Sequence, residues 1–546
     1  MAISKIKITN FKCFKNTFEF KLNKKLNILV GNNDSGKSTI LEAIHMALTS
    51  LYGGRNIKNE LTQYIFNDEI VSEYIKSVNS GKSISPPSVI IEVFFDGTID
   101  PTFEGNSNSD GINGIEGLKF EISYNSKFDD EYHNLIKKKS MQSLPIEYYD
   151  VSWTTFARTV ITVRSIPLKS AMIDSSNHKF QNGSDVYISR IVKDLLTPEE
   201  ITSVAQAHRN MKERFIDDES IVSINERIQK ESSIIDGKVS LSVDLGTKSA
   251  WENSLVTQLN DIPFGYIGKG SQCIVKTELA LTHKRSQSAQ IILLEEPESH
   301  LSYSKLNQLI NAIENKYEDK QIIISTHNSF VANKLGLEHL MLLNNHEIIK
   351  FDELPSASFF KKIAGYDTLR LVLSKKSILV EGDSDELVVQ KAYMMAHDGK
   401  LPIHDGVDVI SVGTSFLRFL EIAEKLNINV SVVTDTDFDI KVLERKYDGY
   451  LGDNKKSNIK ICYDTEVDSG TLKIGDKNFN YNTLEPKLLK CNSLKLLNEI
   501  FDTSYKSDDE MHKYMKNNKT ECALKIFDTD KAIVIPSYIL EAIADE

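Results

Sequence analysis

Residues 31–38 read Gly-Asn-Asn-Asp-Ser-Gly-Lys-Ser and lie between an apolar run at 26–30 and an amphipathic segment at 40–48. This is the pattern of a Walker A loop, in which a strand ends in a glycine-containing turn and a helix begins. The backbone N–H groups of such a loop face phosphates, its lysine reaches the β- and γ-phosphates, and the next hydroxyl ligates Mg²⁺. The stretch therefore predicts a nucleoside triphosphate site built from Gly31, Asn32, Asn33, Ser35, Gly36, Lys37, Ser38 and Thr39.

Two later apolar runs complete this predicted site. Residues 291–294 are followed by Glu295 and Glu296, and residues 321–326 are followed by His327. We interpret the first run as a Walker B strand and the histidine as the switch residue. Glu295 is expected to hold Mg²⁺ through water, and Glu296 is expected to be the general base that orients the attacking water.

Acidic residues also end two strands of the second half. Residues 378–380 run into Glu381, and residues 430–434 run into Asp435 and Asp437. Carboxylates at the C-terminal ends of neighbouring parallel strands converge where such sheets bind ligands, and they suit a hard cation such as Mg²⁺ or Mn²⁺. Acidic residues also cap helices and fill turns. Either segment alone fits that simpler interpretation, whereas the pair favours a metal site.

Length and composition limit the remaining possibilities. A chain of 546 residues has room for three or four domains. Its N-terminus has no long apolar run, so we expect a cytoplasmic protein without a membrane partner, and five scattered cysteines predict reduced thiols. The net charge of −12 gives no general attraction to DNA. Any DNA contact must therefore come from bound metal or from local basic patches, for which these residues are candidates: Lys137, Lys138, Lys139, Arg158, Arg164, Lys375, Lys376, Lys455 and Lys456.

The predicted organisation is α/β with a helical insert. Residues 1–165 would form the first part of an ATPase domain, 166–250 a helical dimerisation insert, 251–355 the second ATPase part, and 375–546 a separate α/β domain. Thr197, Pro198 and Glu200 are typical of a helix start, and helices are expected over 201–215 and 221–235. Residues 97–117, rich in Gly, Asn, Asp and Ser, predict a flexible insertion.

The order of these motifs resembles an ATP-binding cassette ATPase of the structural-maintenance and recombination type. The opening residues 8–14 (ITNFKCF) are similar to those of that group, and residues 268–272 lie where it has its signature segment. The resemblance implies that Gly270 and Ser271 grip the γ-phosphate of ATP held by another subunit, so that hydrolysis needs a dimer. A Gly-x-Gly-Ser sequence also occurs in ordinary turns, and both interpretations stay open.

The whole combination resembles the OLD (overcoming lysogenization defect) family of nucleases, an ATPase followed by a Toprim domain. The resemblance implies that Glu381, Asp435 and Asp437 hold catalytic metal. It also implies that Asp385 and Glu485 are further ligands and that Lys519 lies near the scissile phosphate. DNA as substrate, ATP and Mg²⁺ as cofactors, a homodimer or higher oligomer and a role in anti-phage defence follow from it. A helicase, or a retron reverse transcriptase with its RNA and DNA, is the implied partner.

One departure and two alternatives accompany this expectation. Walker B has Glu295 where most ATPases have aspartate, which predicts looser Mg²⁺ geometry and slow turnover. A DNA-clamping ATPase that does not cut would need long heptad arms, which are absent from the sequence. A Toprim nucleotidyl transferase of the topoisomerase type would need a domain with a nucleophilic tyrosine. A metal-dependent DNA endonuclease is the function that we expect.

Overall fold

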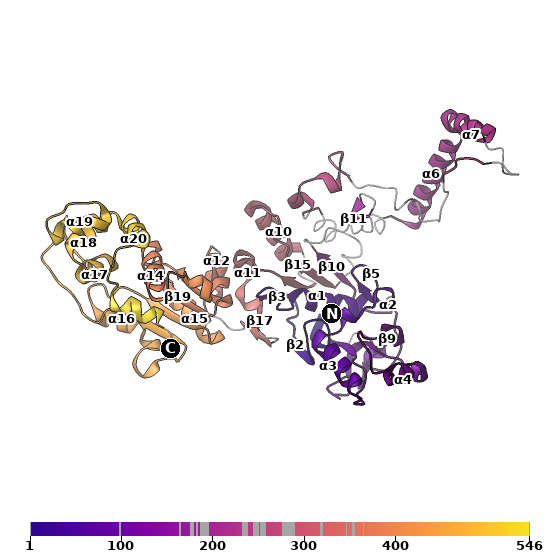
Figure 1. Ribbon diagram of the computed structural model, residues 1–546, viewed down its shortest axis with the longest axis horizontal. Helices are drawn as coiled ribbons and strands as arrows, with labels where there is room; N and C mark the ends of the chain where they lie inside the picture. The colour runs from indigo at the N-terminus through magenta and orange to yellow at the C-terminus, as the bar shows by residue number, and fades with distance from the viewer. Residues whose placement is uncertain are drawn as a thin grey trace. The chain divides into compact units, whose positions relative to one another are not determined.

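The computed structural model divides the chain into two units, and Figure 1 colours the chain by residue number from indigo to yellow. One unit comprises Met1–Thr326 and Leu343–Ile348, and the other His327–Leu342 and Ile349–Glu546. The candidate DNA contact Arg164, Cys273 and the end of the second expected helix lie outside the described residues. The structure describes residues 2–97, 100–162, 165–174, 180–181, 184–185, 196–231, 239–243, 251, 258–272, 274–275, 290–316, 320–344, 347–351, 355–363 and 365–544.

An antiparallel sheet forms the first layer of the N-terminal unit. Its order is β2-β1-β6-β8-β7, and β9 pairs with β8. Alternating burial explains these strands, because Phe18 and Phe20 of β2 are buried while the residues beside them are exposed. The strands are β1 (Ala2–Thr9), β2 (Thr17–Lys21), β6 (Val89–Asp96), β7 (Glu104–Gly105), β8 (Ile115–Tyr124) and β9 (Tyr149–Thr155).

A second sheet of this unit contains the nucleotide-site motifs. Its order is β10-β15-β16-β3, completed by β17 and β18, and the first four strands pair in parallel. The apolar runs at 291–294 and 322–324 are buried throughout, as expected for parallel strands covered on both faces. Helix α1 (Lys37–Thr49) contacts strands of both sheets. The strands are β3 (Leu26–Gly31), β10 (Ser170–Asp174), β15 (Ile291–Glu295), β16 (Gln321–Ser325), β17 (Leu340–Asn344) and β18 (Glu347–Lys350).

The expected helix start at Thr197 is confirmed. The Thr197 hydroxyl accepts from the Glu200 N–H, and the Glu200 carboxylate accepts from the Thr197 N–H, so α6 (Pro198–Ile216) begins with a capping box. No residue of α6 is buried within this chain. The other elements here are α2 (Ile57–Glu60), α3 (Asp68–Asn79), α4 (Asp129–Lys137), α7 (Glu219–Glu231), α10 (Tyr303–Lys316), and the short strands β4 (Leu51–Tyr52), β5 (Arg55–Asn56), β11 (Phe180–Gln181), β12 (Ser184–Asp185), β13 (Gln258–Leu259) and β14 (Ile262–Pro263).

The segment 100–117, expected to be a flexible insertion, packs against the antiparallel sheet instead. Asp110 forms ion pairs with Lys5 and Lys7 of β1. The Ser109 N–H donates to the buried Glu92 carboxylate of β6 at 2.9 Å. Charged groups buried on a sheet need partners, and this segment supplies them. Its polar composition therefore reflects pairing with the sheet.

The C-terminal unit is built on a parallel sheet of order β20-β19-β21-β22. Its strands are β19 (Lys376–Val380), β20 (Val407–Ser411), β21 (Asn429–Val433) and β22 (Ile459–Cys462), with the short hairpin β23 (Lys473–Ile474) and β24 (Lys477–Asn478). The helices are α11 (Ser329–Leu335), α12 (Ala357–Lys362), α13 (Thr368–Leu373), α14 (Asp383–Ala396), α15 (Phe416–Leu426), α16 (Ile440–Lys446), α17 (Leu484–Cys491), α18 (Leu494–Phe501), α19 (Asp508–Asn517), α20 (Lys519–Asp528) and α21 (Ser537–Ile543).

Helices α14, α17, α20 and α21 pack around a core on one side of this sheet. Ile378, Val388, Leu488, Ile526 and Ile539 belong to that core. Such packing brings α17 and α20, more than a hundred residues after β19, beside its C-terminal end. Residues distant in sequence can therefore share one site there.

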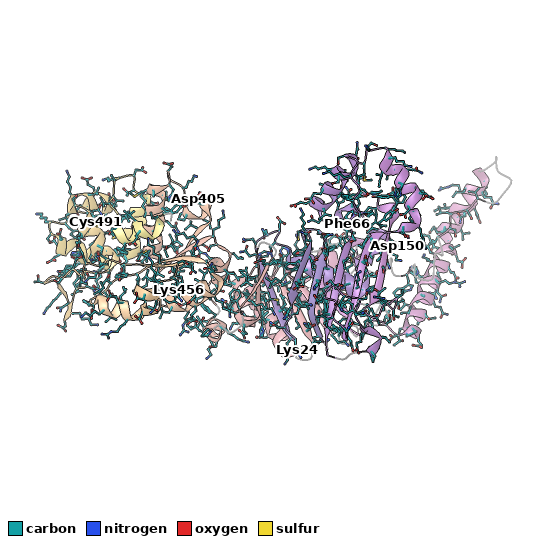
Figure 2. The ribbon with its side chains drawn as sticks, turned by 90° about the horizontal axis from the view of Figure 1, so that it is seen from below. Lys24, Phe66, Asp150, Asp405, Lys456 and Cys491 are labelled. Atoms are coloured by element: carbon teal, nitrogen blue, oxygen red, sulfur yellow. The ribbon has the colours of Figure 1, made fainter. Side chains whose placement is uncertain are left out.

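Two general expectations concern membranes and thiols. Within the described ranges, no helix has the length and apolar character needed to cross a bilayer. Four cysteines fall in those ranges and have free thiols: Cys13 is half-buried, Cys462 and Cys522 are buried, and Cys491, labelled in Figure 2, is exposed.

Candidate functional site

The loop between β3 and α1 encloses the side chain of Lys37. Its Nζ donates to the carbonyl oxygens of Gly31 at 2.9 Å and Asn32 at 2.8 Å. Burial lowers the pKa of Lys37, and the nearby Glu296 carboxylate opposes that shift. The cation thus lies inside the loop, where phosphate oxygens can replace the two carbonyls as its partners.

The other predicted loop residues lie around this lysine. Asn32, Asn33 and Ser38 are exposed, whereas Thr39 is buried. Gly36 has a φ of 107°, and a Cβ there would lie 2.7 Å from the Phe14 ring. Only glycine fits this position without displacing its neighbours.

Glu295 and Glu296 follow one another at the end of β15 but have different surroundings. Glu295 shares a hydrogen bond with Ser38, which opposes the rise that burial causes in its pKa. Glu296 has a left-handed φ of 41°, and its N–H donates to the Ser325 carbonyl at 3.0 Å. The Ser299 hydroxyl donates to its carboxylate at 3.3 Å. The two neighbouring glutamates are thus oriented separately, one toward Ser38.

The segment 268–272 lies beside the turn that follows β15. A Cβ on Gly270 would lie 2.4 Å from the His300 carbonyl oxygen, so the backbones are in close contact. Gln272 is buried and donates to the carbonyl of Phe264 at 3.0 Å. Ser271 is exposed. His327, one residue after Thr326, is also exposed.

Glu381 and Asp435 meet at one edge of the C-terminal sheet, as the sequence predicts. They follow β19 and β21, which are adjacent parallel strands with Leu379 opposite Val432. The Glu381 carbonyl accepts from the Gly413 N–H at 3.1 Å, so the loop after β20 lies against the same edge. Three strand ends therefore define the site.

Asp385 and Glu485 join this edge from two helices. Asp385, in the first turn of α14, accepts from the Gly382 N–H at 3.1 Å, and burial raises its pKa to about 6 with a further contribution from Glu485. The pKa of Asp435 is also raised, first by burial and then by Asp385 and Glu485. Repulsion between crowded carboxylates thus reinforces the effect of burial.

Lys519, the first residue of α20, is the cation of this cluster. Its Nζ lies 3.1 Å from Oε1 of the buried Glu485. Burial opposes the charged form of the lysine, but Glu485 and Asp435 together raise its pKa. Lys519 therefore stays protonated beside the carboxylates.

Asp437 lies at the rim of the cluster and differs from Asp435. It is exposed, has a left-handed φ of 55°, and accepts from the Asn480 amide at 2.9 Å. Among the described residues, no group of three or more His, Cys, Asp or Glu side chains is arranged to hold a metal ion. The carboxylates share an edge without forming a closed coordination shell, and Mg²⁺ sites commonly rely on water and substrate oxygens to complete theirs.

Two neighbours of the cluster are absent from the sequence predictions. The Asn480 amide donates to the Asp437 carboxylate at 2.9 Å, and Asn480 lies in none of the motifs quoted from the sequence. Tyr538 is buried, and burial together with the nearby Asp435 raises its pKa. No local pattern marks Tyr538, because α21 reaches the site only through tertiary packing.

Several predicted basic contacts have other partners. Lys456, labelled in Figure 2, pairs with Glu424 at 2.8 Å. The Lys376 Nζ donates to the Ala544 carbonyl at 3.0 Å. These cations are less available to DNA than the sequence suggests.

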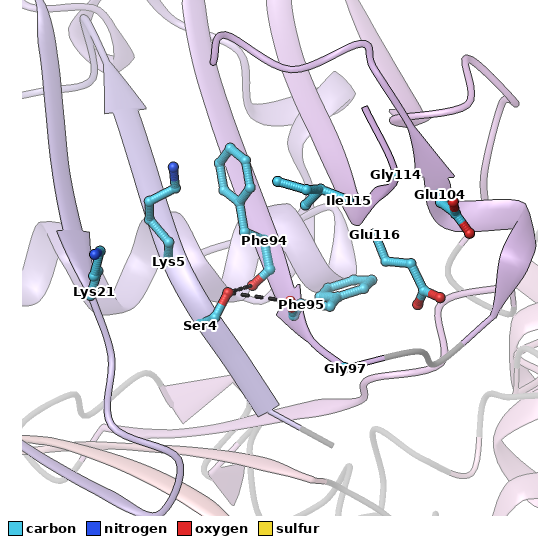
Figure 3. Close-up of a pocket in the computed structure, with 10 residues that line it drawn as sticks. All are labelled: Ser4, Lys5, Lys21, Phe94, Phe95, Gly97, Glu104, Gly114, Ile115 and Glu116. Atoms are coloured by element: carbon cyan, nitrogen blue, oxygen red, sulfur yellow. Dashed lines mark hydrogen bonds between the residues drawn. The ribbon is translucent and has the colours of Figure 1, made fainter. Parts of the chain in front are cut away.

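A surface pocket of about 450 Å³ lies on the antiparallel sheet of the N-terminal unit, and Figure 3 shows its lining. The Lys5 ammonium lies 4.1 Å from the centre of the Phe94 ring, while Glu104 and Glu116 bring opposite charge. None of the predicted site residues lines this pocket.

Comparison with known proteins matches both units to families. The profile of the AAA ATPase domain family matches residues 1–332, more than half of the chain. The profile of the overcoming lysogenization defect protein-like Toprim domain matches residues 372–437. The second match includes Glu381, Asp385, Asp435 and Asp437, whereas Glu485 and Lys519 lie beyond it.

One curated relative and two solved structures illustrate these similarities. The retron Vc95 probable ATPase of Vibrio cholerae serotype O1 biovar El Tor is 21% identical over 451 residues, 73% of this chain and 84% of that protein. An Smc head bound to the C-terminal winged-helix domain of ScpA is 14% identical with a TM-score of 0.33, covering 65% of this chain and 98% of that one. The SMC head domain from Thermotoga maritima is 14% identical with a TM-score of 0.29, covering 64% and 100%.

Proposed function

Because the chain belongs to the OLD family, in which an ATPase domain is joined to a Toprim domain, we propose that it is a metal-dependent DNA endonuclease regulated by its ATPase domain. The observation that supports this proposal best is the edge formed by the ends of β19 and β21. There Glu381, Asp385, Asp435 and Glu485 gather, with Lys519 held against Glu485 at 3.1 Å.

This donor set suits a hard divalent cation. All its members are carboxylates. Burial first, and then repulsion among these carboxylates, raises the pKa values of Asp385 and Asp435, and a bound cation would offset both effects. In our proposal Glu381, Asp385, Asp435 and Glu485 hold one or two Mg²⁺, or Mn²⁺, with Asp437 at the rim. When bound, such an ion polarises the phosphate and lowers the pKa of bound water.

The chain's own groups position the substrate. Lys519, kept protonated by Glu485, donates to a non-bridging oxygen of the scissile phosphate. Glu485 fixes the direction of that ammonium, since its Oε1 accepts from the Lys519 Nζ at 3.1 Å while its Oε2 accepts from the Thr483 hydroxyl at 3.2 Å. The two contacts leave the glutamate little rotational freedom.

The nucleotide site acts as the regulator. Lys37 exchanges its two carbonyl partners for phosphate oxygens, Ser38 and Glu295 lie where Mg²⁺ would be held, and Glu296 orients the attacking water. Gly270 and Ser271 would grip the γ-phosphate held by a second copy, whereas His327, which follows β16 beside β3, would contact the γ-phosphate held by its own Walker A loop. Binding of ATP is then coupled to dimerisation.

The proposed biological role is anti-phage defence. The relative from Vibrio cholerae has a name that refers to a retron. We therefore propose a retron reverse transcriptase with its RNA and DNA as partner, and a helicase as the second possibility. Deleting the gene of either partner and scoring phage resistance distinguishes the two.

A plasmid assay tests the nuclease proposal. We expect the full-length protein to nick or cut supercoiled plasmid in Mg²⁺ or Mn²⁺, and EDTA to stop it. Asp435→Asn should lower the cleavage rate by about 100-fold or more, because a ligand of the metal is lost. ATP binding should be unchanged. The matched control is Asp405→Asn near the start of β20, at the opposite edge of the sheet.

Three results decide the outcome. Loss of cleavage in Asp435→Asn with activity retained in Asp405→Asn supports the proposal. Equal cleavage by both variants and the parent contradicts it. Absence of cleavage by the parent in either metal, with or without ATP, contradicts it as well.

A further inference from the structure

Helix α16 and the residue before its cap present an unusual surface. Phe438 is 64% exposed and Val442 61% exposed, and Lys441, Arg445 and Lys446 are exposed around them. We call these five side chains the α16 strip. Phe438 lies between Asp437 and Asp439, and Val442, one helical turn later, follows Lys441. Two large apolar side chains exposed beside three cations indicate a surface that meets a ligand.

The strip is held firmly in place. The Asp439 carboxylate accepts from the Lys441 N–H at 2.9 Å and so caps α16. On the inner face of the helix Leu443 and Tyr447 are buried, the tyrosine completely. The other four side chains of the strip are therefore presented by the helix itself, and Phe438 by the turn directly before its cap.

The α16 strip also borders the carboxylate edge at both of its ends. Phe438 directly follows Asp437, two residues beyond Asp435. At the other end the Lys446 Nζ lies 5.3 Å from the centre of the Phe416 ring. Phe416 begins α15 directly after the loop whose Gly413 N–H donates to the Glu381 carbonyl.

The cations of the strip differ from Lys487 and Lys490 of the same unit. Over the described ranges, Lys441, Arg445 and Lys446 have no carboxylate partner within ion-pair distance. By contrast Lys487 pairs with two aspartates and Lys490 with Glu466 and Asp468. Charge on α16 is thus available to an external anion.

We propose that the α16 strip binds an unpaired stretch of DNA strand and directs it to the carboxylate edge, with its cations on phosphates and Phe438 stacked on a base. This inference rests on the proposed nuclease function and adds the substrate class. Cations meet the phosphates of single and double strands alike. An aromatic ring can stack on a base only where that base is unpaired or displaced from its helix.

Binding of two labelled DNA probes tests the proposal with the full-length protein. The probes are a 30-nucleotide single strand and a blunt duplex of the same sequence, in EDTA so that neither is cut. Phe438→Ala should raise the Kd for the single strand about tenfold and leave the duplex Kd unchanged. The control is Ile403→Ala, an apolar side chain of similar exposure (60%) in the same unit.

The cations are tested by their salt dependence. Replacing Lys441 and Arg445 together by alanine should weaken the binding of both probes. For the single strand it should also lower the slope of log Kd against log salt by about 1.4, because two phosphate contacts of about 0.7 each are lost. The matched control replaces Lys400 and Lys425. Both are exposed, and topology places them at the opposite edge of the sheet, before β20 and β21.

The outcomes separate this inference from the proposed function. If Phe438→Ala raises the Kd for both probes equally, or for neither, the proposed stacking of Phe438 on a base is wrong. If the strip variants behave as their controls while the parent still cuts plasmid, the strip is wrong and the nuclease stands. If Phe438→Ala instead changes only the association state of the protein by light scattering, the strip is a protein contact and the inference falls.

Discussion

Asp385 shows how a single side chain links the site to stability. Its pKa is raised to about 6 from the usual 3.8 by burial and by Glu485. Between these two pH values the folded protein binds more protons than the unfolded chain. The free energy of unfolding therefore falls as pH rises from about 4 to about 6, by up to about 3 kcal/mol.

Asp385→Asn should remove this penalty while keeping an acceptor for the Gly382 N–H. We expect its melting temperature in EDTA to exceed that of the parent by about 5 °C at pH 8. At pH 4.5 the difference should fall to about a third of that value, because Asp385 of the folded parent is then mostly protonated while that of the unfolded chain is still mostly ionised. Asp383→Asn, an exposed carboxylate of the same helix turn, is the control. An equal shift at both pH values would contradict the assignment.

At the level of elements, the strand, loop and helix from β3 to α1 act as one structure. Gly36 connects them with a φ of 107°, and a Cβ added there would lie 2.7 Å from the Phe14 ring and 2.9 Å from the Cys13 Sγ. The ring and thiol come from the segment that follows β1, so the antiparallel sheet helps to shape the nucleotide loop. Any side chain at Gly36 meets both backbone strain and a steric clash.

Gly36→Ala separates these two costs when it is compared with Gly54→Ala. Gly54 also has a positive φ, 82°, but a Cβ there meets nothing within 4 Å. Gly54→Ala should destabilise the protein by about 1 kcal/mol and leave ATP affinity unchanged. Gly36→Ala should cost more and weaken ATP binding at least tenfold, measured by calorimetry. Equal behaviour of the two variants would show that the loop tolerates a Cβ.

At the scale of the whole molecule, two surfaces suit a second copy of the chain. Tyr266 is 84% exposed just before the segment 268–272, and Ser271 of that segment is exposed. Helix α6 is amphipathic, yet none of its residues is buried within the chain. Exposed apolar groups at both places favour association.

Glu296→Gln should trap the dimer that we propose. We expect the variant to bind ATP without turnover and to accumulate as a dimer at micromolar concentration, measured by light scattering. Adding Tyr266→Asp to it should restore the monomer, since a charge would be buried in the interface. Adding Ile403→Asp, an exposed site in the other unit, should leave the dimer intact. A monomer in all variants, with and without ATP, would contradict the dimer.

Local patterns in the sequence determined much of this protein. The Walker A loop, the strand ends at Glu295, Glu381 and Asp435, and the helix start at Thr197 each depend on residues a few positions apart. Their backbone geometry follows from glycine, capping and alternation, which act over short distances. These elements could therefore be predicted without knowledge of the fold.

Pairing between distant segments was decided only by the tertiary structure. Residues 100–117 pack because Lys5, Lys7 and Glu92 require charged or polar partners, which their composition alone does not reveal. Lys456 pairs with Glu424, whereas the cations of α16 stay available. Tyr538 reaches the carboxylates from the far end of the chain. In each case the free energy of the interaction depends on which charged groups and rings become neighbours when the chain packs. Those neighbours are set by the three-dimensional fold and cannot be read from the local sequence.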